Sequence, residues 1–504
     1  MSEPTADHII LSACIAPCLV EVSVPALSSD RTNRVVDEFY RKARTMMHRP
    51  LLLVPGLVLL VSTTAMAADP LVPGSGLDSS GTLRQFEPGK IQSTSRSVFL
   101  QGLIDLDAIQ QGNYTDGNGD LSDHRSQGWY RAELGARISV DERIEVQVSL
   151  AGQGIMGGNL PTDNGAIYGV TNTNGPNNGQ TGNAVIDDAF VKLKDFLNYR
   201  ELALDAGRMP VSYNLRRDHA AFLYDSRADY RTITSWDGLR AAYNLDSVNI
   251  LPYVYRLPDN SQLYGLSLEW EPPKSGNDRL FFQGSANLER NVLLHDGTTG
   301  DSLQTYYVGG DADLGDFELF GEFAMQSGKQ TDSVKFKGFA FSGGIDWHID
   351  NTVVGFQGDY FTGDDNPTDG ENKAFINNWE GMSDTDIVEN EKYGEMSRLL
   401  TGNLHAYKCK IEIALDDKKR VRVKSIYAMY KTDVSLAGSG SKNFGQEVDI
   451  HLAWDYTRNA TITLLGGVFK PDDAYKAART AAPAPVAAGT DLIYLLGANL
   501  LVKF

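Results

Sequence analysis

The chain ends in YLLGANLLVKF (residues 494–504), a stretch in which every second residue, counted back from the end, is apolar. The members of this series are Phe504, Val502, Leu500, Ala498, Leu496 and Tyr494. A period of two indicates a β-strand, because successive side chains point to opposite faces of a sheet. A last strand of this kind can pair with the first strand of the same sheet. The sheet would then close into a barrel without open edges.

The same period recurs through the chain, for example in residues 130–139, 144–150, 407–413 and 447–456. In each segment one face is almost wholly apolar and the other carries charge. The strands that contain these segments are expected to run about nine to eleven residues, which is enough to cross a bilayer at a tilt, and Trp and Tyr gather near their ends. After residue 70 no uninterrupted apolar run reaches the roughly 18 residues of a spanning helix. A membrane protein of this composition must be a closed barrel, because lipid cannot satisfy an open sheet edge. The terminal Phe also resembles the C-terminal signature of outer-membrane barrels.

We therefore predict an all-β fold, a closed antiparallel transmembrane β-barrel with long external loops. The chain length suits 18 strands, with 16 as the alternative. The barrel is expected over residues 97–504, after an N-terminal periplasmic segment at residues 68–96. Long polar connections are expected at residues 152–182, 363–393 and 470–489, and the acidic stretch from Asp384 to Glu391 is expected in a solvated external loop.

The N-terminus carries a predicted signal peptide over residues 46–67. His48 and Arg49 precede an apolar run, and Ala65 and Ala67 frame an A-x-A cleavage site. A short membrane anchor is the alternative, but the apolar run is too short for it. Residues 1–45 are interpreted as a mis-called upstream extension without ordered structure, in preference to a functional pre-domain.

Composition excludes several classes of function. The formal net charge of −19 disfavours nucleic-acid binding, which rewards a basic surface. Beyond the predicted cleavage site Cys409 is the one remaining cysteine, so an intramolecular disulfide is excluded. The sequence lacks G-x-S-x-G, H-E-x-x-H and P-loop motifs, so we predict no enzyme, cofactor or metal site. A barrel esterase with a Ser–His pair stays an alternative.

Arginine is concentrated between Gly207 and Arg256. Rings of Arg and Lys inside a pore favour anions, and the guanidinium fork pairs well with carboxylates. We predict an anion path lined by Arg131, Arg137, Lys192, Arg208, Arg216, Arg217, Arg227, Arg231, Arg240, Lys408 and Arg422. The alternative is that these cations pair with inward carboxylates as structural ladders, among them Asp105, Asp107, Glu133, Glu145, Asp188, Glu412, Glu447 and Asp449.

Several segments, in this order, resemble the bacterial alginate-export family of outer-membrane barrels. They are Asp188–Leu193 with Ala206–Arg208, then Arg231–Arg240 ending in Trp236-Asp237-Gly238-Leu239-Arg240, then Tyr360–Pro367, Asn403–His405 and Phe444–Asp449. The resemblance implies an 18-stranded barrel with an arginine-rich lumen that passes an anionic polysaccharide outward.

Together these features predict an outer-membrane channel of a Gram-negative bacterium. It would pass an anionic solute, such as the polysaccharide alginate, by passive diffusion or export and without a cofactor. Its expected partners are outer-membrane lipid, the anionic solute and periplasmic export proteins, and nucleic acid is excluded. The alternative is a structural or surface polysaccharide-binding barrel with a plugged lumen.

Overall fold

The computed structural model describes residues 8–15, 18–25, 89–93, 96–113, 125–155, 185–211, 235–257, 260–273, 279–294, 298–376, 384–389, 402–481 and 488–504. The chain divides into two units, residues 1–70 and 71–504. In the first unit, β1 (His8–Ile15) and β2 (Cys18–Pro25) pair antiparallel. The interpretation of residues 1–45 as an upstream extension of the mature protein stays a prediction. The predicted signal peptide at residues 46–67 lies outside the described residues.

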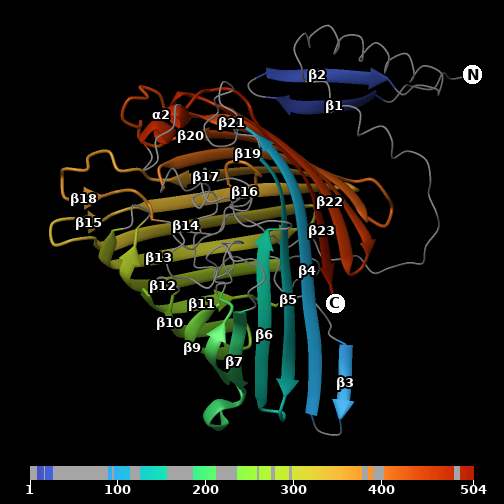
Figure 1. The fold of residues 1–504 in the computed structure, drawn as a ribbon, viewed down its shortest axis with the longest axis vertical. Helices are drawn as coiled ribbons and strands as arrows, with labels where there is room; N and C mark the ends of the chain where they lie inside the picture. Colours follow the sequence, from blue (N-terminus) through green and yellow to red (C-terminus); the bar gives the residue numbers. More distant parts are fainter. Residues whose placement is uncertain are drawn as a thin grey trace, which may run out of the picture. The chain divides into compact units, whose positions relative to one another are not determined.

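The second unit is a closed barrel of 18 antiparallel strands, which confirms the predicted fold class (Figure 1). Each strand pairs with the next along the chain, and the last pairs with the first. The strands are β4 (Arg96–Gly112), β5 (Arg125–Ser139), β6 (Ile144–Ile155), β7 (Val185–Leu193), β8 (Leu202–Met209), β9 (Trp236–Leu245), β10 (Val248–Arg256), β11 (Gln262–Trp270), β12 (Arg279–Leu293), β13 (Thr299–Leu314), β14 (Phe317–Lys329), β16 (Phe339–Ile349), β17 (Thr352–Phe361), β19 (Leu404–Ala414), β20 (Val421–Lys431), β21 (Asn443–Thr457), β22 (Ala460–Pro471) and β23 (Ile493–Lys503).

Short and long connections alternate along the barrel. Residues 246–247, 315–316, 350–351 and 458–459 make tight turns, whereas β6 and β7, β8 and β9, and β17 and β19 are far apart in sequence. Short turns face the periplasm in such barrels and long connections face outward. The long connections carry β15 (Lys335–Phe336), which pairs in parallel with β18 (Glu371–Asn372), and helix α2 (Asp473–Ala481). Within the described residues, no helix has the length and apolar character needed to cross a bilayer.

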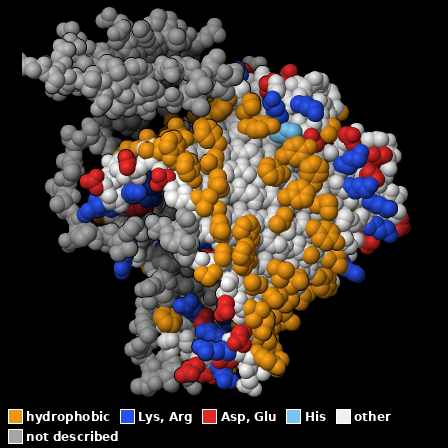
Figure 2. Space-filling view, turned by 180° about the vertical axis from the view of Figure 1, so that it is seen from behind, with side chains coloured by type: hydrophobic (Ala, Val, Ile, Leu, Met, Phe, Trp, Pro, Cys, Tyr) orange, Lys and Arg blue, Asp and Glu red, His pale blue; other side chains and the backbone are white. Residues whose placement is uncertain are grey.

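The two faces of the barrel wall differ in chemistry. Outward side chains are apolar and exposed, as shown by Leu134 at 54% and Val308 at 55%. Figure 2 shows this apolar surface, with charged side chains gathered toward its margins. Inward positions on the same strands are polar and buried, as at Glu133 and Thr305. A wall with an apolar outer face and a polar lumen is the arrangement that a lipid bilayer requires.

The barrel closes where β23 meets β4. Gly102 and Phe504 exchange two backbone hydrogen bonds of 2.7 and 3.0 Å, and the register continues to the pair Tyr494 and Gly112. Leu496 and Phe504 are about half exposed on the outer face. The first residues of β4 extend beyond β23 and pair with β3 (Gly89–Ser93) instead. Both stretches of this edge are therefore covered by a partner.

Gly102 leaves the space that the terminal aromatic ring needs. A Cβ built at Gly102 would overlap the ring of Phe504. We expect Gly102→Leu to displace this ring and to destabilise the closed barrel by about 1–3 kcal/mol. The measurement is the folded fraction on a gel that separates heat-modifiable folded barrels from unfolded chain, across a urea series.

Gly358→Leu on β17 is the matched control, because a Cβ there has no heavy atom within 4 Å. Equal losses in both variants would contradict a specific role for the contact between Gly102 and Phe504.

Candidate functional site

Lys408 is the centre of a buried charge cluster on the inner face of β19. Its ammonium lies 2.8 Å from Asp359 Oδ2, 2.7 Å from Asp384 Oδ2 and 2.8 Å from Glu389 Oε1. Its side chain is only 4% exposed. A buried charge is costly unless it is paired and hydrogen bonded, so this ammonium needs its three carboxylates. Through this cluster, residues 384 and 389 of the connection between β17 and β19 are attached to the barrel wall.

Strand β21 binds the stretch between these two residues through its carboxylates. Glu447 accepts hydrogen bonds from the backbone N–H groups of Ile387 and Val388, at 2.6 and 3.0 Å. Asp449 accepts one from the backbone N–H of Asp386 at 3.2 Å. Carboxylates that accept backbone N–H bonds make strong, charge-assisted contacts. These inward acids therefore satisfy the backbone of a segment that has no regular secondary structure.

Two side-chain contacts complete this attachment. His451 Nε2 lies 2.7 Å from Asp386 Oδ2, and the hydroxyls of Thr385 and Tyr430 are 2.7 Å apart. We call residues 384–389 the inserted segment, since Thr385, Ile387, Val388 and Glu389 are buried among the inward side chains of β17, β19, β20 and β21.

The inserted segment corrects one expectation from the sequence. The acidic stretch from Asp384 was expected in a solvated external loop, and for residues 384–389 this is wrong. The stretch contains apolar Ile387 and Val388, and the wall supplies a partner for each of its acids. Residues 390–391 of that stretch lie outside the described residues.

The same connection between β17 and β19 is attached to the wall at a second place. Gln326 on β14 donates to the carbonyl of Ile376 and accepts from its N–H, both at 2.7 Å. Phe375 is buried against Phe361, with ring centroids 5.8 Å apart. The long connection therefore enters the barrel, and it narrows the lumen from inside.

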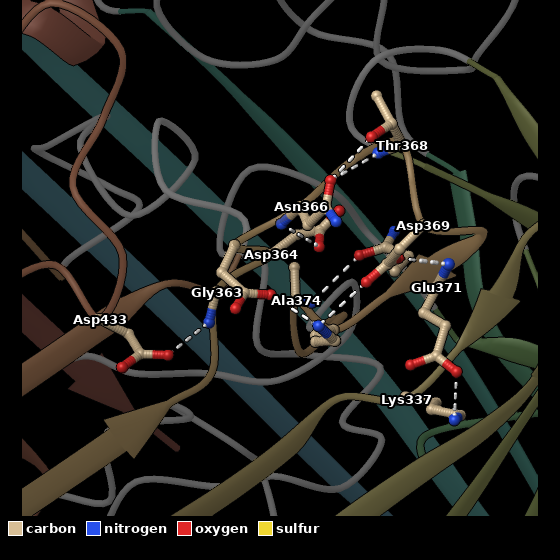
Figure 3. Close-up of polar contacts among 12 residues, drawn as sticks. Lys337, Gly363, Asp364, Asn366, Thr368, Asp369, Glu371, Ala374 and Asp433 are labelled. Atoms are coloured by element: carbon tan, nitrogen blue, oxygen red, sulfur yellow. Dashed lines mark hydrogen bonds and ion pairs between the residues drawn. The ribbon is translucent and has the colours of Figure 1, made fainter.

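Before it enters, the connection forms a polar turn over residues 363–374 (Figure 3). The side chain of Asn366 accepts bonds from Thr368, and Lys373 Nζ lies 2.7 Å from Asp365 and 3.1 Å from Asp369. These carboxylates raise the pKa of the Lys373 ammonium. The Lys373 ammonium thus balances the negative charge of these carboxylates. The described part of the chain contains no cluster of metal-ligating residues.

Several cations predicted to line the path face inward but are paired with carboxylates. Arg131 on β5 is buried and forms an ion pair with Glu133. Arg240 on β9 lies 2.7 Å from Asp205. On β20, Arg422 lies 2.7 Å from Asp455. For these residues, as for Lys408, the geometry agrees with the structural-ladder alternative.

Two further predicted cations face inward with less definite partners. Arg137 is half exposed, lies over the ring of Phe99 and has Glu145 at 3.9 Å. Lys192 is opposite Glu145 on β6 and Asp205 on β8 in register. Arg216, Arg217, Arg227 and Arg231 lie outside the described residues.

Arg208 was predicted in the lumen, and this prediction is wrong. Its neighbours Asp205 and Met209 are buried on the inner face of β8, so Arg208 has the opposite parity. Its guanidinium forms two hydrogen bonds with Asp237, at 2.8 and 2.9 Å, and both side chains are over 40% exposed. The Arg cluster in the sequence is therefore split between the two faces of the wall.

Carboxylates outnumber cations along one part of the lumen. Among the described inward positions of β11 to β14 and β16, Arg279 is the one Lys or Arg side chain. The acids at inward positions of these strands are Glu269, Glu289, Asp311, Asp313, Glu318, Glu322 and Asp346. Arg279 is itself 3.1 Å from Glu271. Several of these acids are nearly fully buried. The sequence showed inward acids, but it did not show that they gather on neighbouring strands.

Comparison with known proteins gives this barrel its family. The sequence profile of the family described as "Alginate export" matches residues 125–486. The chain belongs to the alginate export family. No curated protein sequence is significantly similar to it.

Solved structures share the fold of this alginate export family member. OccAB3 of Acinetobacter baumannii aligns with a TM-score of 0.54 at 11% identity, covering 81% of this chain and 99% of that chain. OccD3 (OpdP) of Pseudomonas aeruginosa aligns with a TM-score of 0.52 at 10% identity, covering 86% and 99%. The protein is an outer-membrane channel of a Gram-negative bacterium.

The segments that suggested the alginate export family lie at structurally demanding positions. Trp236 begins β9, is fully buried and packs edge-on against Tyr255, with centroids 5.9 Å apart. A Cβ at Gly238 would overlap the backbone of β10, so only glycine fits there. Tyr360 and Phe361 end β17 and lead into the turn of Figure 3.

Proposed function

We propose that the channel passes an anionic solute by passive diffusion or export, with an anionic polysaccharide such as alginate as the cargo that its family suggests. The polar lumen of a closed barrel, narrowed by the inserted segment, is the observation that carries the transport role. No nucleophile–base pair is part of this proposal, and we expect no catalysis.

The lumen is a place where charge decides which ions pass. In a narrow pore, rings of charged side chains select ions of the opposite sign. The cations of the described lumen are largely paired with carboxylates. The arginines of residues 212–234, which are part of the predicted anion path, lie outside the described residues. The acid-rich part of the wall at β11 to β16 favours a second candidate, a channel for cationic solutes.

Reversal potentials in planar bilayers separate these candidates. Under a potassium chloride gradient, the proposal predicts a chloride-to-potassium permeability ratio above unity. Neutralising Asp311 and Glu322, as Asp311→Asn with Glu322→Gln, should raise this ratio further, because the lumen loses negative charge.

A wild-type ratio below unity that rises toward unity in this double variant would contradict an anion path and support the cation channel. A polysaccharide-binding barrel with a plugged lumen is a third candidate, favoured by the attachment of the inserted segment. It predicts no conductance at any protein dose.

A further inference from the structure

A row of eight polar side chains, five of them basic, crosses the outer face of the barrel at the external ends of eight consecutive strands. Its members are direct neighbours in the strand registers, each paired with the next across the sheet. The row, from β8 to β15, is Arg208, Asp237, Arg256, Gln262, Arg290, Ser302, Lys329 and Lys335. We call its five cations the basic row.

The parity of each strand places the basic row on the outside. Tyr255 and Glu289, which precede Arg256 and Arg290, are buried on the inner face. Phe336 is buried next to exposed Lys335. Further along the same outward parity, Val308 and Phe323 are exposed apolar residues of the lipid-facing surface.

The basic row lies where the apolar surface ends. Tyr264 and Tyr306 lie on the same face and closer to the middle of the bilayer than the row does. Their hydroxyls donate hydrogen bonds to Gln262 and Gln304, at 2.8 and 3.2 Å. Tyrosines of outer-membrane barrels mark the membrane–water interface. The long connections from β8 to β9 and from β17 to β19 leave from this same end of the barrel, so this interface is the external one. The basic row is therefore level with the lipid headgroups of the outer leaflet.

Neighbouring acids neutralise the basic row only in part. Arg208 pairs with Asp237, and Lys329 lies 2.6 Å from Asp332 and 3.9 Å from Asp301. Arg256 donates to the neutral side chain of Asn260 at 2.8 Å.

Among the described residues, the remaining two cations of the row, Arg290 and Lys335, form no ion pair with a carboxylate. The five cations of this row therefore face three described carboxylates, those of Asp237, Asp301 and Asp332, in a chain whose net charge is −19.

We propose that the basic row binds the phosphate groups of phosphorylated glycolipid headgroups in the outer leaflet. Guanidinium groups pair with phosphate in two-toothed fashion, and an ammonium adds a point charge. Cations on every second strand are about 10 Å apart, from the spacing of neighbouring strands. A headgroup with two phosphates can therefore contact two of them. The row would hold a shell of lipid at this side of the barrel, whatever solute passes through the lumen.

Native mass spectrometry of the purified barrel in neutral detergent tests this proposal. The probes are lipid A with two phosphates, the same lipid after enzymatic dephosphorylation, and inorganic phosphate. Wild type should retain the phosphorylated lipid in preference to both others. The triple variant Arg256→Gln, Arg290→Gln, Lys335→Gln should bind it at least tenfold more weakly, since each cation near an anionic lipid surface is worth about a fivefold change. The retained lipid should also fall as salt is raised, because salt screens exposed charges.

The matched control removes three exposed cations from the short-turn end of the same barrel, as Arg200→Gln, Lys419→Gln, Arg458→Gln. It should bind the phosphorylated lipid like wild type. Three outcomes would overturn the proposal: equal losses in both triple variants, equal retention of the dephosphorylated lipid, or equal binding of inorganic phosphate. The substituted side chains are exposed, so folding is checked simply by heat modifiability on a gel.

Discussion

Replacing Lys408 by Met is expected to open the channel, with single-channel conductance in planar bilayers severalfold above wild type. The substitution leaves Asp359, Asp384 and Glu389 close together without their shared cation. Removing one partner of a buried ion pair costs about 3–5 kcal/mol, because the remaining charge is uncompensated. The inserted segment can escape that cost by leaving the wall, and its departure widens the lumen.

Lys410→Met is the control for this experiment. Lys410 is the next inward residue of β19 and pairs with Asp346 at 2.7 Å, away from the inserted segment. Its loss should leave conductance near the wild-type value. Glu447→Gln should also free the inserted segment from the wall and raise conductance, because it weakens the hydrogen bonds to Ile387 and Val388. We call it and Lys408→Met the release variants. If both release variants conduct like wild type, the inserted segment does not narrow the path.

Val308→Arg is expected to cost about 2–4 kcal/mol of folding free energy in a bilayer, which is the penalty for a charge on the lipid face near mid-membrane. Val308 is 55% exposed on the outer face of β13. It lies midway between the turn after Leu314 and Ser302, which is the register partner of Arg290 in the basic row. The loss should appear in urea titrations of the barrel reconstituted in vesicles.

Ser302→Arg places the same side chain on the same face of the same strand, at the membrane interface. There the penalty falls to about 0–1 kcal/mol. The difference between the two variants measures depth in the bilayer, because the strand and the substituted residue type are shared. Equal costs at both positions would contradict the assignment of the apolar surface to lipid.

The period of two was sufficient to predict the barrel, because one face of every strand must meet lipid and the other water. It gave the strand count through chain length, and the alternation at residues 447–456 correctly put Glu447 and Asp449 inside. Periodicity is a local property, so it survives without knowledge of distant contacts.

The placement of the inserted segment depends on contacts that sequence does not display. Its attachment joins Asp384 to Lys408 on β19 and Ile387 to Glu447 on β21, which are separate strands. Arg208 was misplaced for a different reason. The run of arginines suggested a shared role, whereas parity relative to buried Met209 decides which face each one occupies. Counting parity from Met209 would have corrected this prediction.

The seam between β4 and β23 has a consequence for the order in which the protein acquires its shape. Asn499 donates to Asp107 across the seam at 2.8 Å, a contact between residues 392 positions apart. Joining such distant parts of a chain requires the largest loss of chain entropy of any pairing in the barrel. Strand β4 therefore cannot pair with β23 until the C-terminal residues have reached the barrel. Until then residues 103–112 of β4 are without β23, whereas residues 96–100 can already pair with β3, which precedes β4 in the chain.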